Sequence, residues 1–496
     1  MNAPVKLGHP KALYVLFMAE MWERFCYYGM RALLTLYLIN TLMMGDEAAF
    51  AIYGAYTALV YAAPVLGGKL ADSLLGYRNA VILGGVLMAI GEFVILGGTE
   101  SWLYLGMGAI IVGNGYFKAN ISSIVGKLYD DGDPRKDSGF TIFYIGINVG
   151  ALLATTVCAE VGIKFGYHYG FALAGVGMIL GVLVFIFGSG RFKEHSAPPN
   201  PERLYAKDFG PFNRFHLTIL GSLLAIPLLY LLIRYNQVVG ILLAVVAVYV
   251  IFTLLSTAFS GDKVLRDRIL VLIILMFFNI VFWACFEQAG TSLTLFAERN
   301  VDRDIFGWEM GSATTQFFNP LFILIFGSIF SVMWVKLSAI KKNPSIPAKF
   351  AFGIIQLGLG YLVVMLGNAF VSPEYLVPLW TVTFLYLLHT TGELFLSPIG
   401  LSMVTKLAPK EMTGTVMGAW FLSFAGSNYL AAIIASATGG HEHGASDAAI
   451  AESLEPANTL ATYVDVYSTM GFITIGIGVF LLIISPFLNK MMHGVK

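Results

Sequence analysis

Charged residues are scarce in this chain. Lys, Arg, Asp and Glu make up 12% of its 496 residues, whereas soluble domains average about 25%. Because a soluble domain needs a charged surface, the shortage excludes that class. Together with a mean hydropathy of +0.76, it indicates a polytopic membrane protein. The 30 basic residues are balanced by 30 acidic ones, so no basic surface for nucleic acid is predicted.

Cysteine is also rare. The three cysteines, Cys26, Cys158 and Cys285, all lie in apolar segments, so no disulfide framework is predicted. The N-terminal segment has no small-residue cleavage site, and Arg24 interrupts the apolar run that a signal peptide would need. We therefore expect the first helix to be retained.

Long apolar runs are abundant instead. Runs of about 20 residues are long enough to cross a hydrocarbon core of about 30 Å as helices. They lack the strict alternation of barrel strands, so the predicted fold class is an all-α polytopic membrane protein with fourteen transmembrane helices. The predicted runs are 12–38, 50–71, 79–98, 102–122, 139–163, 169–188, 215–233, 238–257, 268–297, 314–335, 349–368, 375–399, 413–437 and 465–488.

Loop composition predicts orientation and domain organisation. With a cytoplasmic N-terminus, most basic residues fall in inside segments, and the outside loops hold only Lys164, Arg234, Arg299 and Arg303. Both termini are then cytoplasmic, and the chain is integral to the cell (inner) membrane. We predict an N-terminal six-helix bundle at 1–188, a cytoplasmic linker with two extra, lipid-facing helices at 189–267, and a C-terminal six-helix bundle at 268–496. Two six-helix halves resemble the major facilitator fold, which places substrates near the bilayer midplane.

The segment EMWERFCYYGMR (20–31) carries ionisable groups inside an apolar run. At about 100° per residue, its polar side chains fall within an arc of roughly 140°. A charge at the bilayer centre costs about 2.5–3.5 kcal/mol or more, so such groups line a cavity or pair with one another. A buried ion-pair cluster that only fixes packing is the alternative. The polar residues of this face are Glu20, Glu23, Arg24, Tyr27, Tyr28 and Arg31.

Three more charged residues, Lys118, Glu287 and Glu393, lie in other apolar runs. Intramembrane charges of both signs suit a zwitterionic ligand, because cations bind a carboxylate and an acid binds an ammonium group. An acid in excess could take up a proton. Neutral hydrogen-bonding groups for amides are supplied by Asn148, Asn319, Tyr27, Tyr28 and Tyr61.

Several motifs identify a known family. The pattern ExxERFxYY is intact at 20–28, GGKLADSLLGYR follows the second run at 67–78, and FKANISSIVGKLYDDGDPRKDSGFTIFYIGINVGA spans 117–151. FWACFEQ (282–288), FFNPLF (317–322) and GELFLSPIGLSMVTKLAP (392–409) come later. From about residue 11 to 490 the chain resembles the proton-dependent oligopeptide transporters of the major facilitator superfamily. The resemblance implies secondary active import of di- and tripeptides with protons by alternating access.

The resemblance also assigns roles. Glu20, Glu23, Arg24 and Glu287 would serve proton coupling, with Glu287 pairing with Arg31. Arg31 and Lys118 would hold the peptide carboxylate, and Glu393 the ammonium group. Asn148 and Asn319 would bind the peptide amides. Further substrate-binding residues by this resemblance are Tyr27, Tyr28, Tyr61, Trp283, Trp420, Ser397 and Asn428.

Two positions depart from the family pattern. Some members carry a second acid before the acid of the seventh helix, where this chain has Phe286, and some carry a histidine on the second helix, where it has Gly54. The coupling role therefore shifts to Glu20, Glu23 and Glu287. In the turn after the second helix, we predict that Asp72 and Arg78 act as gating residues on the cytoplasmic side.

Other functions are less well supported by the residues. No Ser/His or Ser/Lys pair, nucleotide loop or metal-ligand spacing is evident, so we predict neither an enzyme nor a metal site; the histidines of HEHG (441–444) lack further ligands. No cofactor is expected beyond the coupling proton, and the predicted partners are peptides, protons and membrane lipid, without an obligate protein partner. The alternative is a transporter of the same fold that carries an anion or a drug-like compound.

Overall fold

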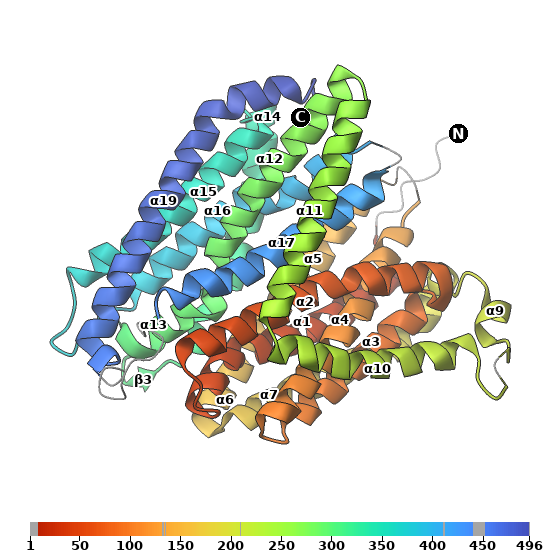
Figure 1. Ribbon diagram of the computed structural model, residues 1–496, viewed down its shortest axis with the longest axis horizontal. Coiled ribbons are helices and arrows are strands. Elements are labelled where there is room, and N and C mark those ends of the chain that lie inside the picture. Colours follow the sequence, from red (N-terminus) through yellow and green to blue (C-terminus); the bar gives the residue numbers. More distant parts are fainter. Residues whose placement is uncertain are drawn as a thin grey trace. The chain divides into compact units, whose positions relative to one another are not determined.

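The computed structural model describes residues 8–130, 133, 135–208, 210–409, 412–439 and 452–495. Its contacts divide the chain into two compact units (Figure 1). The first unit comprises residues 1–34 and 59–235, and the second comprises residues 35–58 and 236–496. The second unit therefore includes the end of the first helix and the beginning of the second.

The regular elements in the described part of the first unit are all helices. Its elements are α1 (Lys11–Asn40) as far as Leu34, α2 (Asp46–Leu70) from Leu59, η1 (Ala71–Leu75), α3 (Tyr77–Ile95), α4 (Glu100–Lys127), α5 (Lys136–Leu153), η2 (Ala154–Cys158), α6 (Ala159–Phe165), α7 (Tyr167–Gly188), η3 (Ser189–Phe192), α8 (Lys193–Ser196), α9 (Pro201–Tyr205) and α10 (Arg214–Arg234). Side chains cap two of the later helices at their starts: Asn200 accepts from the Arg203 amide at 2.8 Å and Asn213 from the His216 amide at 2.9 Å.

The second unit adds four very short strands to its helices. Its further elements are α11 (Gln237–Ser260), α12 (Lys263–Phe286), η4 (Glu287–Gly290), α13 (Ser292–Asn300), β1 (Val301–Asp302), β2 (Asp304–Ile305), β3 (Trp308–Glu309), η5 (Ala313–Phe317), α14 (Phe318–Ala339), α15 (Ile346–Asn368), β4 (Val377–Pro378), α16 (Trp380–Leu407), α17 (Thr413–Ser436) and α19 (Pro456–Met491). Strand β1 pairs in parallel with β4, and β2 pairs antiparallel with β3.

Each predicted apolar run overlaps at least one of these helices, and some runs cover more than one element. The all-α prediction is confirmed. Among the described residues, eleven helices are long and apolar enough to cross a membrane. Helices α1, α4 and α16 are not among them, although they have 30, 28 and 28 residues. These three carry most of the predicted site charges, which lower their hydropathy. The count of fourteen spans stays a prediction.

Glycine allows close helix packing in both units. A Cβ on Gly84 of α3 would lie 2.9 Å from the Phe117 amide nitrogen of α4, and one on Gly353 of α15 would lie 2.7 Å from the Gly392 carbonyl oxygen of α16. Small residues of this kind let membrane helices approach backbone to backbone. Gly76, between η1 and α3, has φ +71°, a conformation that other residues rarely adopt.

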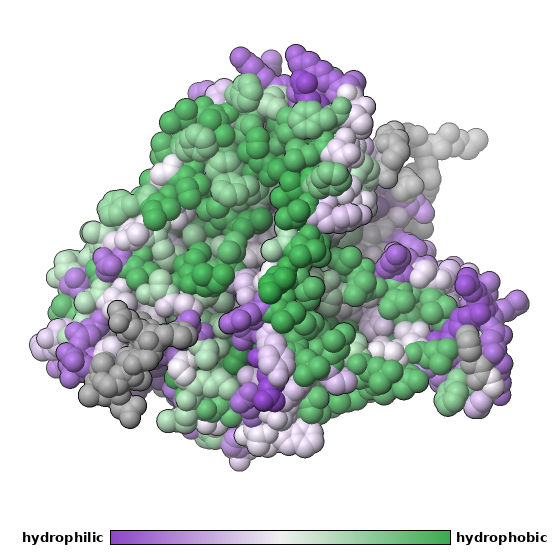
Figure 2. Space-filling view, viewed as in Figure 1, coloured by the Kyte–Doolittle hydropathy of each residue, from purple (hydrophilic) through white to green (hydrophobic). Residues whose placement is uncertain are grey.

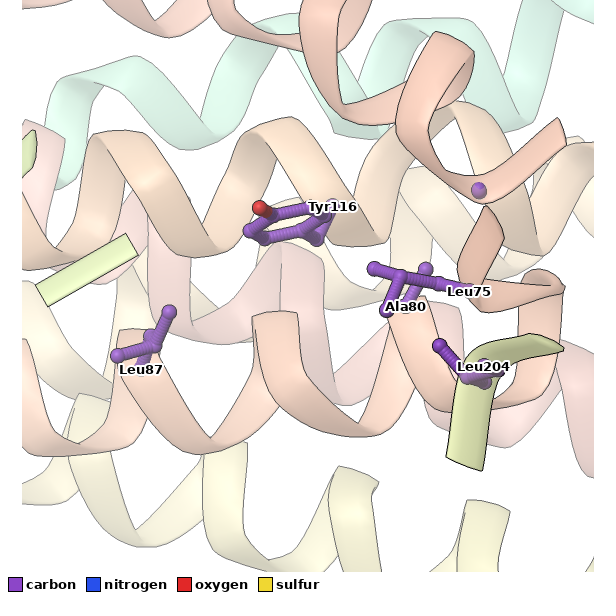
Figure 3. Packing of buried hydrophobic residues seen from close by; sticks show 6 residues of the cluster. Leu75, Ala80, Leu87, Tyr116 and Leu204 are labelled. Carbon is purple, nitrogen blue, oxygen red and sulfur yellow. The ribbon is translucent and has the colours of Figure 1, made fainter. Parts of the chain in front are cut away.

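The segment predicted to be a cytoplasmic linker packs on the first unit through Leu204 of α9. This side chain is fully buried in a cluster with Ala71, Leu75, Ala80, Leu87 and Tyr116 (Figure 3). The two extra helices belong to different units: α10 packs along α4, and α11 packs along α12 and α17. The domain boundaries at 188 and 267 stay a prediction.

Apolar side chains dominate the surface of the two extra helices. In α10 and in α11, only 11% of the apolar 18-residue stretch is buried inside the protein. Figure 2 shows hydrophobic residues over both helices and hydrophilic residues around the segment that carries α9. Such exposed apolar helices are compatible with contact to lipid.

Candidate functional site

The acids and the arginine of ExxER form a dense ionic cluster on α1. Arg24 Nε lies 3.2 Å from Glu20 Oε1 and also donates to Glu23 Oε2. The exposed fractions of the three residues are 2% for Glu20, 0% for Glu23 and 3% for Arg24. Three of the six residues of the predicted polar face thus pair their charges with one another, as burial demands.

Sequence reasoning missed the residue that orients Glu23. Asn114 of α4 is fully buried and donates from Nδ2 to Glu23 Oε1 at 3.1 Å. Arg24 and Asn114 thus occupy different oxygens of one carboxylate. The available signal was a lone amide in an apolar helix, within GNGYFK, four residues before Lys118.

The other two cations predicted for the site in the first unit lie over aromatic rings. Lys118 Nζ is 4.1 Å from the ring centre of Tyr61, and Arg31 Cζ is 5.8 Å from that of Tyr28. Lys118 and Tyr61 are half-buried. A cation over the face of a ring is attracted by the ring quadrupole.

Two further predicted residues complete this face of the first unit. The Tyr27 ring lies 5.2 Å from the Tyr28 ring, and Arg24 Cζ is 5.5 Å from the Tyr27 ring centre. Asn148 of α5 is buried, and its Nδ2 donates to the Tyr144 carbonyl at 3.0 Å within its own helix. One N–H of the Asn148 amide is thereby used within the helix, and its amide oxygen can accept a hydrogen bond from another group.

The second unit contains a different polar cluster around Glu393 on α16. Asn319 of α14 donates from Nδ2 to Glu393 Oε2 at 2.9 Å and to Thr390 Oγ1 at 3.0 Å. Glu393 is 8% exposed. Asn319 and Glu393, predicted separately, thus form one hydrogen-bonded group. Thr390 was not predicted, although it lies one turn from Glu393.

A second hydrogen-bond chain fixes the predicted tryptophan of α12. Trp283 Nε1 donates to Asn279 Oδ1 at 3.1 Å, and Asn279 Nδ2 donates to Ser423 Oγ at 2.9 Å. The Trp283 ring lies 5.2 Å from that of Phe424, which in turn contacts Trp420 at 6.1 Å. Asn279 and Ser423 were missed by sequence reasoning.

The remaining predicted residues of the second unit are Asn428, Ser397 and Glu287. Asn428 of α17 is buried, and its Nδ2 donates to the Phe424 carbonyl at 2.9 Å. Ser397 of α16 is half-buried. Glu287 is buried at the start of η4, immediately after α12 ends. Arg31 belongs to the first unit and Glu287 to the second, and their pairing stays a prediction.

Gly54, the position without a helix-2 histidine, has a structural reason to be small. A Cβ there would lie 3.2 Å from the Asn428 carbonyl oxygen and would meet the Ala432 side chain still more closely. A histidine at this position could not keep the present contact between α2 and α17. The departure from the family pattern is therefore matched by the local packing.

The predicted gating residues bind other partners than one another in this structure. Asp72 of η1 accepts from the Tyr77 hydroxyl at 2.7 Å, and Arg78 Nε donates to Ser189 Oγ at 3.1 Å. Both contacts lie within the first unit. Their gating role stays a prediction.

An unpredicted ion pair ties residues 35–58 to the rest of the second unit. Arg299 of α13 donates to both Asp46 oxygens, at 2.6 and 2.8 Å. Nearby, Thr35 Oγ1 donates to the Gly290 carbonyl at 2.6 Å. Neither loop arginines nor the first turn of α2 gave a sequence signal for this pairing.

The described residues contain no group of three or more His, Cys, Asp or Glu side chains that could hold a metal ion. The HEHG segment at 441–444 lies outside the described residues. The polar groups assembled in the two units are thus carboxylates, cations, amides and aromatic rings. They can exchange protons and bind charged or amide-containing ligands.

Helices of this length and hydropathy, with a buried ionic cluster on α1, Lys118 on α4 and the buried Glu393 on α16, define an integral membrane protein of the major facilitator fold. The family model described as the POT family, the proton-dependent oligopeptide transporters, matches residues 78–447. The chain belongs to this family.

Relatives extend the match to the whole chain, including the ExxER segment that precedes the matched region. Dipeptide and tripeptide permease B of Photorhabdus luminescens is 33% identical over 99% of this chain and 100% of its own length. An uncharacterised transporter of Bacillus subtilis is 37% identical over 98% and 96%. A crystal structure of the peptide transporter POT in complex with sulfate superimposes with a TM-score of 0.83 at 34% identity, covering 99% of this chain and 98% of that one.

Proposed function

We propose that this protein imports di- and tripeptides across the cell (inner) membrane together with protons, by alternating access, with both termini in the cytoplasm. The observation that carries the proposal is the Glu393–Asn319 pair. A buried acid beside an amide matches the ammonium group and first peptide bond of a short peptide. Relatives over the full length are named dipeptide and tripeptide permeases.

The opposite end of the peptide requires cations. Lys118 and Arg31, each over a tyrosine ring, would bind the terminal carboxylate. Asn148 would accept from a peptide amide through its side-chain oxygen. Rings of Tyr27, Tyr28 and Tyr61 on one unit, and of Trp283 and Trp420 on the other, would contact the side chains of the peptide, with Ser397 and Asn428 as further polar contacts.

Proton coupling would use Glu287 together with the acids of the ionic cluster on α1. In this scheme Glu287 takes a proton from the outside water, which removes the negative charge predicted to pair with Arg31. Arg31 can then bind the peptide carboxylate. Loss of the proton to the cytoplasm restores the charge on Glu287 and favours peptide release. Glu20 and Glu23 would take part through their shared partner Arg24.

The energy of one proton is sufficient for useful accumulation. Moving one charge through about 100 mV releases about 2.3 kcal/mol. At about 1.4 kcal/mol per factor of ten, this corresponds to a concentration ratio of roughly 40 for a neutral peptide. No additional cofactor is needed for such a cycle.

Reconstituted transport tests the proposal. Purified protein in liposomes would be given labelled dialanine, with an inward proton gradient and a potassium–valinomycin potential, and compared with no gradient. We expect accumulation in the wild type. Glu23→Gln and Glu287→Gln should lose accumulation but keep peptide counterflow, while Glu374→Gln, at an exposed loop position, serves as the matched control.

The substrate class is tested by a second comparison. Glu393→Gln should weaken peptide counterflow at least tenfold, because it removes the charge that binds the ammonium group. Its effect on a simple anion should be small. Absence of uptake and counterflow for a panel of di- and tripeptides would refute the peptide assignment and leave the alternative of a non-peptide substrate.

A further inference from the structure

Glu92 of α3 is a buried acid that the proposed transport cycle does not use. Its exposed fraction is 0%. Oε1 accepts a hydrogen bond from Cys26 Sγ of α1 at 3.4 Å, and Oε2 has no hydrogen-bond partner among the described residues. The packing is close, since a Cβ on Gly175 of α7 would lie 3.1 Å from the Glu92 Cβ.

No cation in the described part of the chain compensates this carboxyl group. The titratable groups near it are Cys26 on α1 and Cys158 on η2. Cys26 is also close enough to Glu23 of the ionic cluster for electrostatic interaction. The residue before Glu92, Gly91, packs against α4, where a Cβ on Gly91 would lie 2.7 Å from the apolar side chain of Ile110.

An ionised carboxylate in this place would be poorly stabilised. A thiol is a weak donor, and a buried charge without a paired cation is far more costly than a buried neutral acid. The ionic cluster shows the contrast: Glu23, equally buried, receives hydrogen bonds from both Arg24 and Asn114. The neutral form of Glu92 is the one that the geometry can accommodate.

We propose that Glu92 and Cys26 form a resident proton site, separate from the Glu20–Glu23–Arg24 cluster, in which Glu92 keeps its proton throughout the transport cycle. Glu92 is then a positioning residue. Its neutral carboxyl group holds α1 against α3 through Cys26, three residues after Glu23. Because the neutral group carries no charge, it adds none to the electrostatic field at Glu23, which Arg24 and Asn114 determine.

Infrared spectroscopy of the purified protein tests the proton directly. We expect a carbonyl band of a protonated carboxyl group that persists at pH 8, well above the ordinary glutamate pKa of about 4.3. The band should disappear in Glu92→Gln. In Cys26→Ser it should move to lower frequency, because a hydroxyl is a stronger donor than a thiol. Absence of any pH-stable band that depends on Glu92 would overturn the proposal.

Cys26→Ser keeps the experiment informative if Glu92→Gln does not fold, because it retains the acid and changes only its donor. An unshifted Glu92 band in Cys26→Ser would contradict the contact on which the site depends. A Glu92→Met variant offers a second neutral replacement of similar length, and we expect it to unfold at a temperature close to that of the wild type.

Transport separates a resident proton from an exchanged one, a step that rests on the proposed function. Glu92→Gln should leave the pH profile of peptide uptake and the number of protons per peptide unchanged, whereas Glu23→Gln should alter the profile. A shifted profile or a lower proton number in Glu92→Gln would show an exchanged proton and overturn the proposal. If the wild type transports no peptide, the proposed function fails, and the infrared result still decides the proton site.

Discussion

Removing the negative charge of Asp46 is expected to weaken the attachment of residues 35–58 to the rest of the second unit. Arg299 donates to both oxygens of Asp46 at 2.6 and 2.8 Å. The Asp46 side chain is 4% exposed and that of Arg299 is 19% exposed. The pair therefore lies between a surface ion pair, which contributes about 0–1 kcal/mol, and a fully buried one.

The free-energy cost of Asp46→Asn follows from this intermediate burial of the ion pair. Removing one partner of a buried pair costs about 3–5 kcal/mol, and water access at Arg299 favours the lower value for Asp46→Asn. A loss of about 3 kcal/mol reduces the ratio of attached to detached segment by roughly 100-fold, at about 1.4 kcal/mol per factor of ten. Thr35 and Gly290 would still hold one end of the segment.

Thiol labelling measures the detachment. Ala49 is fully buried in this segment, so Ala49→Cys reports its opening, and the three native cysteines are buried and supply the background rate. We expect maleimide labelling of Cys at this position to accelerate by up to about 100-fold in Asp46→Asn. Asp46→Arg with Arg299→Asp should restore slow labelling in part.

The control is an exposed pair of the same unit. Arg303 lies 3.3 Å from Glu309, whose side chain is 73% exposed. Glu309→Gln should change the labelling rate by less than about fivefold, since such pairs contribute at most about 1 kcal/mol. Equal labelling rates in the parent and in Asp46→Asn would refute the assigned role of the buried pair.

Three further predictions concern other parts of the chain. Gly353→Val should lower the unfolding temperature by several degrees in a scanning assay, because its side chain would enter the backbone of α16; an unchanged temperature would contradict this. Tyr61→Leu should raise the KM for peptide severalfold by removing the ring under Lys118, with kcat as the internal comparison. Hydrogen bonds from Arg135 lower the pKa of Asp133 to about 2, so this loop contact should persist at neutral pH and be lost as the pH falls from about 4 to 2, visible as a stability loss that Arg135→Gln abolishes.

The helices could be predicted from the sequence because membrane-spanning segments need long apolar runs. The residues at which the helices begin and end were harder to predict. The last predicted run begins at 465, but α19 begins at Pro456, because its first turns are polar enough to escape a hydropathy pattern. The predicted run 268–297 contains a 3-10 segment that begins at Glu287, which no apolar pattern could indicate.

The charged side chains of the site could also be predicted, since a charge in an apolar run is conspicuous. The groups that orient them could not. Asn279 and Thr390 resemble other polar residues of the helices, and the only signal for Asn114 was its place as a lone amide in an apolar helix. Their importance depends on contacts across helices, such as that of Asn114 with Glu23.

Burial of an acid does not by itself indicate a coupling role, and Glu23 and Glu92 illustrate why. Both are fully buried in the first unit. Glu23 has an arginine and an amide on its two oxygens, so its charge is stabilised and can respond when Arg24 moves. Glu92 has only a thiol. We therefore propose that the donors around each carboxyl group, rather than its burial, distinguish an acid that exchanges a proton during transport from one that keeps it.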